Sequence, residues 1–381
     1  MKKTIICGLA LALVIALSGC LEYEYGDWSW EDFIHEEFHL EDPPCEDPPF
    51  EDPPCEEPPC EEPPCETPPR EVLPFEEPAY RTHNIHGGLH RFEHAGSVAY
   101  LFGSLHGGLQ DWFPLAYAVE TAMRRADIFA FEIDFSISSE EMSQIASSLT
   151  YLPDGQTVSD ILCEDLYAHY MTKMANWSRA FPGIMDGINY VNPSFLIFSL
   201  QQALLGILAD IDINMSGITV DGYIMSFAQE NEIPVIGLMD FEAQQRVVLT
   251  PPQEIMLYMV YYLTTFEEFR DELRAEGLEN LNQLVYYYLA NDAEGLAKTM
   301  HYNFDIETEQ PVDRYNREVV LNDRSVLFAT ELIRHMEEAD RSTTFFVTLG
   351  KSHLVRHLAG PYFTSTIEQL ELMGIDVVPI K

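Results

Sequence analysis

The feature that most constrains the fold is a stretch that reads as strand, turn, helix and strand. Ser97–Phe102 is a short apolar run rich in strand-forming residues, and Gly103 ends it. Pro114 suits the first turn of a helix, which apolar residues at helical spacing continue to Arg125. Asp127–Ile133 is a second apolar run. A strand, a helix of this length and another strand predict a parallel βαβ unit with a right-handed crossover.

The same arrangement closes the chain. Thr344–Leu349 predicts a strand, Gly350 follows it, and a helix predicted from about Pro361 to Met373 leads to a last strand around Asp376–Pro379. The pattern G-x-x-H therefore follows an apolar strand directly twice, about 250 residues apart. We expect an α/β fold with a mainly parallel central sheet and many helices, whose active-site edge is formed by the carboxyl ends of the strands.

Between these two units the sequence is mainly helical. Thr157, with Asp160 three residues further on, is typical of a helix N-terminus. Pro234–Leu238 predicts a third short strand, and Cys163 falls in a helical pattern that favours a buried small side chain. Apolar residues at helical spacing predict helices within Glu140–Tyr190, Pro193–Leu208, Val220–Gln229, Pro251–Leu289 and Asp313–Glu338.

A third G-x-x-H string precedes the first long strand. Gly87-Gly88-Leu89-His90 has no strand before it, so we expect a loop or hairpin there. His83, His86, His90 and His94 are spaced by three and four residues, but the two glycines argue against a helix. We therefore expect these histidines to be solvated.

The first twenty residues form a targeting segment. Lys2 and Lys3 provide a basic start, Thr4–Leu17 is almost wholly apolar, and Ser18-Gly19-Cys20 ends the segment. The apolar run is short for a spanning helix. The segment resembles the signal of bacterial lipoproteins, and this resemblance implies a mature chain that begins at Cys20. Lipid on Cys20 would anchor the protein outside the cytoplasm on a bacterial membrane, whereas an ordinary cleaved signal peptide is the alternative.

Residues 21–80 are acidic and rich in proline and cysteine. Six pentads of the type E-D-P-P-C run from Glu41 to Arg70. Paired prolines favour an extended left-handed helix and the carboxylates repel along it, so we expect a disordered or semi-rigid stalk of roughly 90 Å. Neighbouring cysteines would lie roughly 15 Å apart, too far for a disulfide, so we expect disulfide-linked oligomers through Cys45, Cys55, Cys60 and Cys65. The globular domain is expected over residues 81–381.

The charge of the chain excludes two classes of electrostatic partner. The 381 residues carry a formal net charge of −42. Between Leu21 and Tyr80 there are 21 acidic residues against one arginine, so that 1 − 21 = −20 and the stalk holds nearly half of the excess. We therefore expect no binding to nucleic acid or to an anionic membrane surface by charge.

Polar residues follow three of the predicted strands. His106 follows the first strand, Glu132 ends the second, and His353 follows the strand near the C-terminus. Equivalent ends of parallel strands lie on one edge, so we expect these side chains to converge. Histidine and glutamate are ligands of Zn²⁺, Mn²⁺ or Co²⁺, which predicts a divalent metal site. Glu132 is also a candidate general base, and Asp134 lies on its side by strand alternation. Capping of the next helix is the structural alternative for both.

The order and spacing of several motifs resemble one protein family. The motifs are Y-L-F-G-S-L-H, A-D-I-F-A-F-E-I-D, L-P-D-G-Q-T-V-S-D-I-L, V-D-G-Y at Val220, P-V-I-G-L, Asn322-Asp323-Arg324 and F-F-V-T-L-G-K-S-H-L-V. Together they resemble the TraB/GumN family, which is related to the Tiki proteins described as membrane-tethered metalloproteases. The resemblance covers roughly Val98 to Ile380.

The resemblance implies roles for several residues. His106, Glu132 and His353 belong to the site it implies, and Arg324 matches an arginine on the helix before the last G-x-x-H. Arg324 is expected either to stabilise an anionic intermediate or product carboxylate, or to form a salt bridge with Glu132 or Asp134. Gly103 and Gly350 are expected to shape the turns and to leave room for a substrate backbone.

The sequence departs from the family pattern at two positions. Met239 replaces the usual glutamate after P-V-x-G-L, and Asp240 could substitute for it only if the strand end shifted register. Ser325 replaces the usual asparagine after the arginine. We expect slow turnover at best if the missing glutamate is catalytic or a ligand.

Three functions are compatible with the sequence. The first is a metal-dependent hydrolase of peptides at the cell surface. The second is a non-catalytic surface protein that binds or inhibits a peptide signal. The third, a haem or metal carrier, rests on fold analogy alone.

Overall fold

The computed structural model describes part of the globular region. The described residues are 85–105, 112–134, 137–153, 155–178, 185, 187–197, 219–265, 283–300, 311–340, 342–356 and 363–380. The predicted signal peptide, the stalk with its cysteines, Cys20 and His106 lie outside these residues, as do parts of the helices predicted over Pro193–Leu208 and Pro251–Leu289.

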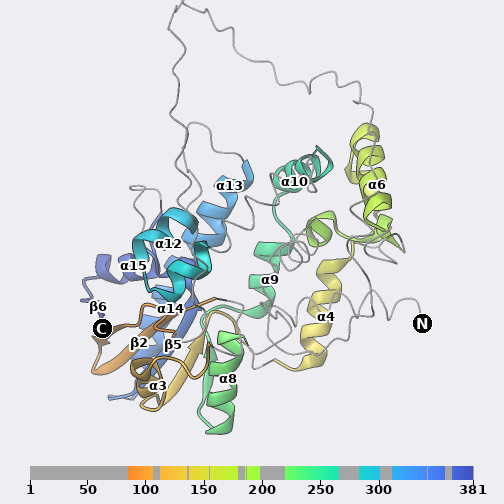
Figure 1. The fold of residues 1–381 in the computed structure, drawn as a ribbon. Helices are drawn as coiled ribbons and strands as arrows, with labels where there is room; N and C mark the ends of the chain where they lie inside the picture. Colours follow the sequence, from red (N-terminus) through yellow and green to blue (C-terminus); the bar gives the residue numbers. More distant parts are fainter. Residues whose placement is uncertain are drawn as a thin grey trace, which may run out of the picture. The chain divides into compact units, whose positions relative to one another are not determined.

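A six-stranded sheet organises the described residues (Figure 1). Its strand order is β4-β3-β5-β2-β1-β6. Pairing is parallel between β4 and β3, β3 and β5, and β5 and β2, and antiparallel between β2 and β1 and between β1 and β6. The predicted α/β class is confirmed. The strands are β1 (His90–His94), β2 (Ser97–Ser104), β3 (Ile128–Phe131), β4 (Val235–Gly237), β5 (Thr344–Gly350) and β6 (Val378–Pro379).

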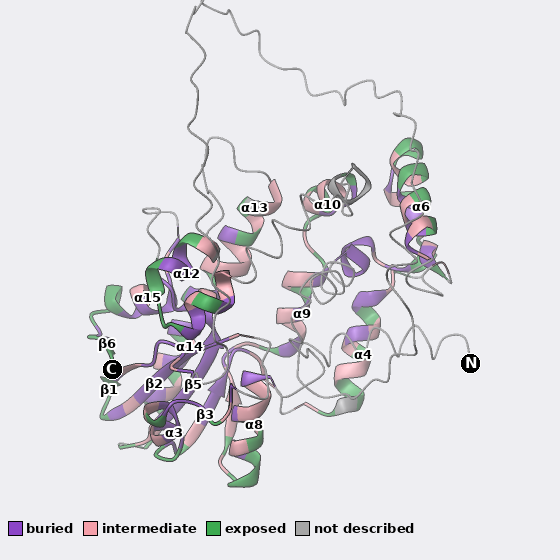
Figure 2. Cartoon of the chain, viewed as in Figure 1, coloured by how far each residue is buried: buried purple, intermediate pink, exposed green. Residues whose placement is uncertain are grey.

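Apolar side chains cover both faces of the sheet because alternate residues of its strands point to opposite sides. On β5, Phe346 joins the core with helices α3 (Tyr117–Met123) and α8 (Val220–Glu230). Its neighbours Phe345 and Val347 join the core with α14 (Arg324–Glu338) and α15 (Thr366–Leu372). The strands β2, β3 and β5 are accordingly buried along most of their length (Figure 2).

A third apolar cluster is made mainly by helices. Its buried side chains come from α4 (Ser139–Thr150), α6 (Glu164–Trp177), α9 (Phe241–Leu249) and α10 (Gln253–Thr265), and from residues 158–162 and 188–197. The remaining helical elements are α5 (Val158–Ile161), η3 (Ile188–Tyr190), α12 (Ala293–Met300), α13 (Pro311–Tyr315), η4 (Asn316–Asp323) and η5 (Lys351–His353).

Helix signals in the sequence predict local structure well. Thr157 is the N-cap of α5, and its backbone N–H donates to the Asp160 carboxylate at 2.8 Å, as the spacing predicts. The prediction for Cys163 is wrong, because this residue is the exposed N-cap of α6.

The segment before β2 is a hairpin rather than a loop. The strand β1 pairs with β2 through a two-residue connection, Ala95-Gly96, in which both residues have positive φ. This conformation is typical of tight hairpins. The prediction that the local histidines are solvated is wrong for His90, which is partly buried and whose Nδ1 lies 2.5 Å from the carbonyl oxygen of Gly88.

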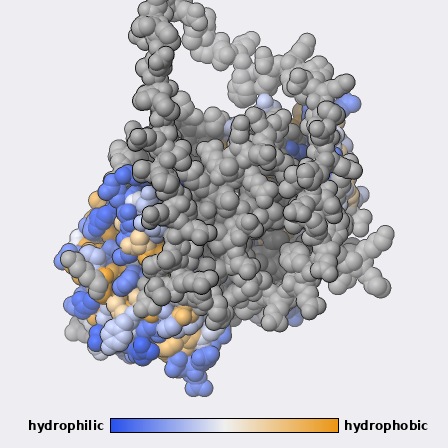
Figure 3. Space-filling model, viewed as in Figure 1, coloured by the Kyte–Doolittle hydropathy of each residue, from blue (hydrophilic) through white to orange (hydrophobic). Residues whose placement is uncertain are grey.

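The described residues that are visible in Figure 3 form a surface of mixed character. The coloured atoms in Figure 3 alternate between hydrophilic and apolar patches, as is usual for a folded protein. Within the described ranges, no helix combines the length and the apolar composition that crossing a membrane requires.

Candidate functional site

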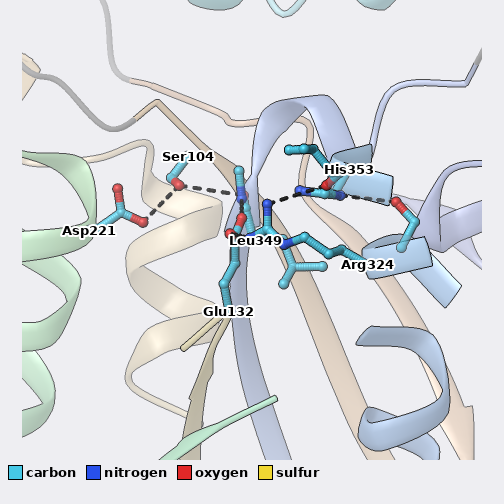
Figure 4. A network of polar contacts seen from close by, with 9 residues as sticks. Ser104, Glu132, Asp221, Arg324, Leu349 and His353 are labelled. Carbon is cyan, nitrogen blue, oxygen red and sulfur yellow. Dashed lines mark hydrogen bonds and ion pairs between the residues drawn. The ribbon is translucent and has the colours of Figure 1, made fainter. Parts of the chain in front are cut away.

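The ends of three neighbouring parallel strands meet at one level of the sheet. Ser104, the last residue of β2, pairs with Gly350, the last residue of β5. Phe131, the last residue of β3, pairs with Thr348, so Glu132 comes just beyond the strand end. The polar side chains that gather here form the candidate site (Figure 4).

The Glu132 carboxylate is held from two sides. Its Oε2 lies 2.6 Å from Nη2 of Arg324, and its Oε1 accepts a hydrogen bond from the backbone N–H of Gly350. Glu132 and Arg324 are only 8% and 6% exposed. A charge-assisted pair of this kind is tightly held when buried. Of the two roles expected for Arg324, the salt bridge to Glu132 is the one present.

Arg324 owes its position to the helix that carries it. It begins α14 directly after the π-helix η4, a rare conformation that is frequent at functional sites. Its Nη1 donates to the carbonyl oxygen of Val320 at 3.3 Å, and its Cζ lies 5.2 Å from the centre of the Phe328 ring. These contacts direct the guanidinium towards Glu132.

His353 is fixed by a second residue of α14. The imidazole is 2% exposed, and its Nδ1 lies 3.0 Å from the hydroxyl oxygen of Ser325. The ring packs edge-on against Phe328, with centroids 5.0 Å apart. A histidine that binds a metal usually has its other ring nitrogen held in this way. Ser325, although not the asparagine of the family pattern, therefore provides a partner for His353.

The end of β4 has a structural role. The backbone N–H of Asp134 donates to the carbonyl oxygen of Met239 at 2.9 Å, and Met239 packs against the apolar core of α14 and α15. Asp240 accepts a hydrogen bond from the Ala243 N–H at 2.9 Å as the N-cap of α9. Phe131 pairs with Gly237 at the end of β4, and the Asp240 carboxylate is engaged at the start of α9.

Strand alternation does not determine the direction of Asp134. The argument that places it on the side of Glu132 requires β3 to continue, but β3 ends at Phe131. Asp134 lies instead against Gly237, where an added Cβ would come within 2.2 Å of the Asp134 Cα. The close approach of two backbones therefore explains the glycine at this position.

The two turn glycines have ordinary backbone conformations. The strand β2 continues through Gly103 to Ser104, and Gly350 has φ −52°, so neither residue needs the left-handed region. A Cβ on Gly103 would lie 2.4 Å from Cδ of Lys351. Gly103 therefore makes room for Lys351.

Lys351 is a buried cation that the sequence did not single out. It is 4% exposed, and its Nζ donates to the carbonyl oxygen of Gly87 at 2.9 Å. The same carbonyl accepts the N–H of Gly103 at 3.0 Å, so it ties the segment before β1 both to the end of β2 and to Lys351 after β5. Burial lowers the pKa of Lys351 to about 8.

A second polar pair was also missed. The Ser104 hydroxyl, which is 1% exposed, donates to Oδ1 of Asp221 at 2.8 Å. Asp221 lies in the first turn of α8, and Tyr288 donates to the carbonyl oxygen of Gly103 at 2.9 Å nearby. Burial and the Asp221 charge raise the pKa of Tyr288 well above its ordinary value. The V-D-G-Y motif was the sequence signal that could have identified Asp221.

The structure brings Glu132, Arg324 and His353 to one end of the sheet (Figure 4). Whether His106 joins them lies outside the described residues. Within the part of the chain that the structure describes, which omits His106, no group of three or more His, Cys, Asp or Glu side chains is arranged to hold a metal ion.

Comparison with known protein families identifies the family of this chain. Residues 88–379 match the TraB/PrgY/gumN family, and this match covers most of the globular part. The chain therefore belongs to the TraB/PrgY/gumN family. No curated protein and no solved structure matched the chain.

Proposed function

We propose that this protein is a lipid-anchored hydrolase outside the cytoplasm, which uses a divalent metal to cleave peptides at the carboxyl edge of its sheet. The observation that carries this proposal is the gathering of Glu132, Arg324 and His353, all more than nine-tenths buried, beyond the ends of β3 and β5. Buried ionisable groups are costly away from water and often belong to functional sites.

The donor set fits a divalent metal of the zinc, manganese or cobalt type. His353 and Glu132, with His106 from the preceding G-x-x-H, would hold it. The Ser325 hydroxyl beside Nδ1 of His353 supports this fit, because it fixes the ring as outer partners of metal ligands do. A metal bound there would polarise the scissile carbonyl and lower the pKa of its bound water.

The side chains of the site would accept the proton of the attacking water and hold the acceptor in position. Asp134, or Glu132 where it does not hold the metal, would accept the proton of the attacking water. Arg324 and the Gly350 N–H hold the Glu132 carboxylate in one orientation, so that this acceptor is already in place when substrate binds. Because Met239 contributes no carboxylate, we expect slow turnover.

The proposal is tested by metal content and turnover together. We expect the purified domain to contain about one equivalent of metal and to cleave members of a peptide library, and chelation to abolish the cleavage. His353→Ala should remove both metal and activity. The matched control is His94→Ala, because His94 is bound to Glu337 near the other end of the sheet. A metal-free protein that cleaves no peptide would contradict the proposal.

A non-catalytic function is the second candidate. Both oxygens of Glu132 already accept hydrogen bonds, and Met239 packs against an apolar core. These observations favour a surface protein that binds or inhibits a peptide signal. Binding of a peptide in the presence of chelator, without cleavage, would support it.

The N-terminal cysteines suggest how copies assemble. We propose that the stalk lifts the domain from the membrane and that its four cysteines link chains through disulfides. The intact protein should migrate as a larger species on a non-reducing gel than on a reducing one. Identical migration on both gels would exclude these links.

A further inference from the structure

One peptide unit of β5 contacts both polar pairs of the site. The Leu349 carbonyl oxygen lies 3.4 Å from the Ser104 hydroxyl, and the N–H of Gly350 donates to Oε1 of Glu132. Ser104 in turn donates to Asp221 at 2.8 Å. Asp221 and Glu132, from α8 and from the end of β3, are thus connected through a single peptide group (Figure 4).

The Ser104 hydroxyl has one hydrogen and two acceptors for it. The contact with the Asp221 carboxylate, at 2.8 Å, is a normal O–H···O distance, whereas the 3.4 Å contact with the Leu349 carbonyl is long. The bond to a carboxylate is also charge-assisted. The Ser104 hydroxyl hydrogen is therefore directed mainly to Asp221. Without the Asp221 carboxylate, it would be donated to the Leu349 carbonyl oxygen.

The direction of the Ser104 hydrogen affects Glu132 through polarisation of the Leu349–Gly350 peptide unit. A hydrogen bond received at a carbonyl strengthens the N–H of the same peptide group as a donor, and the effect is larger away from water. Ser104 and Leu349 are 1% and 0% exposed, so water does not compete for this carbonyl. A stronger bond to the Leu349 oxygen therefore tightens the bond from Gly350 to Glu132.

We infer that Ser104 and Asp221 are positioning residues of the site, which act on Glu132 and on the turn to His353 through the Leu349–Gly350 peptide. The inference rests on the proposed function only for its effect on turnover. Substitution of Ser104 and substitution of Asp221 should shift the Gly350 amide proton in opposite directions.

Amide proton shifts measure that prediction directly. Carbonyl-¹³C leucine with ¹⁵N-glycine selects two amides in the whole chain, those of Gly206 and Gly350, and Gly206→Ala identifies which is which. Ser104→Ala should move the Gly350 amide proton upfield, because its peptide loses a donor at the carbonyl. Asp221→Ala should move it downfield, because the Ser104 hydrogen turns to that carbonyl.

A matched control removes a buried hydroxyl that has no such contact. Thr348 lies on β5 and is 1% exposed, and its Oγ1 has no hydrogen-bond partner among the described residues. Thr348→Val should leave the Gly350 amide proton unchanged. For a peptide that the protein cleaves, Ser104→Ala should lower kcat about tenfold or more with little change in KM, and Thr348→Val should not.

The outcomes separate this inference from the proposed function. The amide shifts require neither metal nor turnover, so an inactive protein still tests them. Shifts of the same sign in both variants, or no shift in Asp221→Ala, would overturn the inference. Asp221 is only partly buried, so this variant decides the question even if Ser104→Ala does not fold.

Discussion

The buried Glu132–Arg324 ion pair should contribute strongly to the free energy of unfolding. Arg324→Met leaves a buried carboxylate without its cation, so we expect the free energy of unfolding to fall by about 3–5 kcal/mol. Urea unfolding measures this change, and adding Glu132→Gln to the same chain should recover part of it. Arg334→Met, which breaks exposed ion pairs of α14, is the control and should change stability little. Equal losses in the two arginine variants would contradict the prediction.

Lys351 makes stability depend on pH in the alkaline range. Its pKa is about 8 in the folded protein and 10.5 when unfolded, so between these values the unfolded chain holds the extra proton. The free energy of unfolding should therefore rise with pH from about 8 to 10.5, by about 3 kcal/mol from this group.

Lys351→Met should remove this rise. Urea unfolding at pH 7.5 and 10 compares the two proteins, and a rise of equal size in both would show that another group causes it. The native protein is expected to gain stability over this interval, whereas Lys351→Met should gain less.

Single residues differ in how far the sequence could predict them. Glu132 and His353 were predictable because each follows an apolar strand, and parallel strands bring such residues to one edge. The bonds between Ser104 and Asp221 and between Lys351 and Gly87 were not, because each joins segments more than a hundred residues apart. Local patterns do not specify such contacts.

At the scale of elements, the N-terminus of α9 decides what Asp240 does. Its carboxylate accepts the Ala243 N–H, so Asp240→Ala should cost about 1 kcal/mol of stability and leave metal content and peptide binding unchanged. Ser138→Ala, which removes the equivalent cap of α4, is the matched comparison and should cost about as much. Loss of metal in Asp240→Ala alone would instead make Asp240 part of the site.

The elements themselves were largely predictable, and the exceptions have physical causes. Long apolar runs predicted β2 and β5, and Thr157 with Asp160 predicted the start of α5. β1 was predicted only as part of a loop or hairpin, because its polar residues do not form an apolar run, and it is held by pairing with β2. The π-helix before Arg324 has the composition of an ordinary helix, so the sequence gives no sign of it.

At the scale of the whole molecule, charge and lipid act in opposite directions. The net charge of −42 gives the protein no electrostatic attraction to an anionic membrane surface. Acyl chains on Cys20 would supply the affinity instead, at about 0.8 kcal/mol for each buried CH₂ group. Retention at the membrane should therefore depend on this one side chain.

Cys20→Ala should release the protein from the membrane fraction without detergent, whereas the native protein should need detergent. Cys7→Ala is the control, because it changes a cysteine inside the apolar part of the signal and leaves the acylation position intact. Fractionation followed by immunoblotting measures both variants. The released form should also lack the lipid mass. A Cys20→Ala protein that stays in the membrane fraction would show that another part of the chain anchors it.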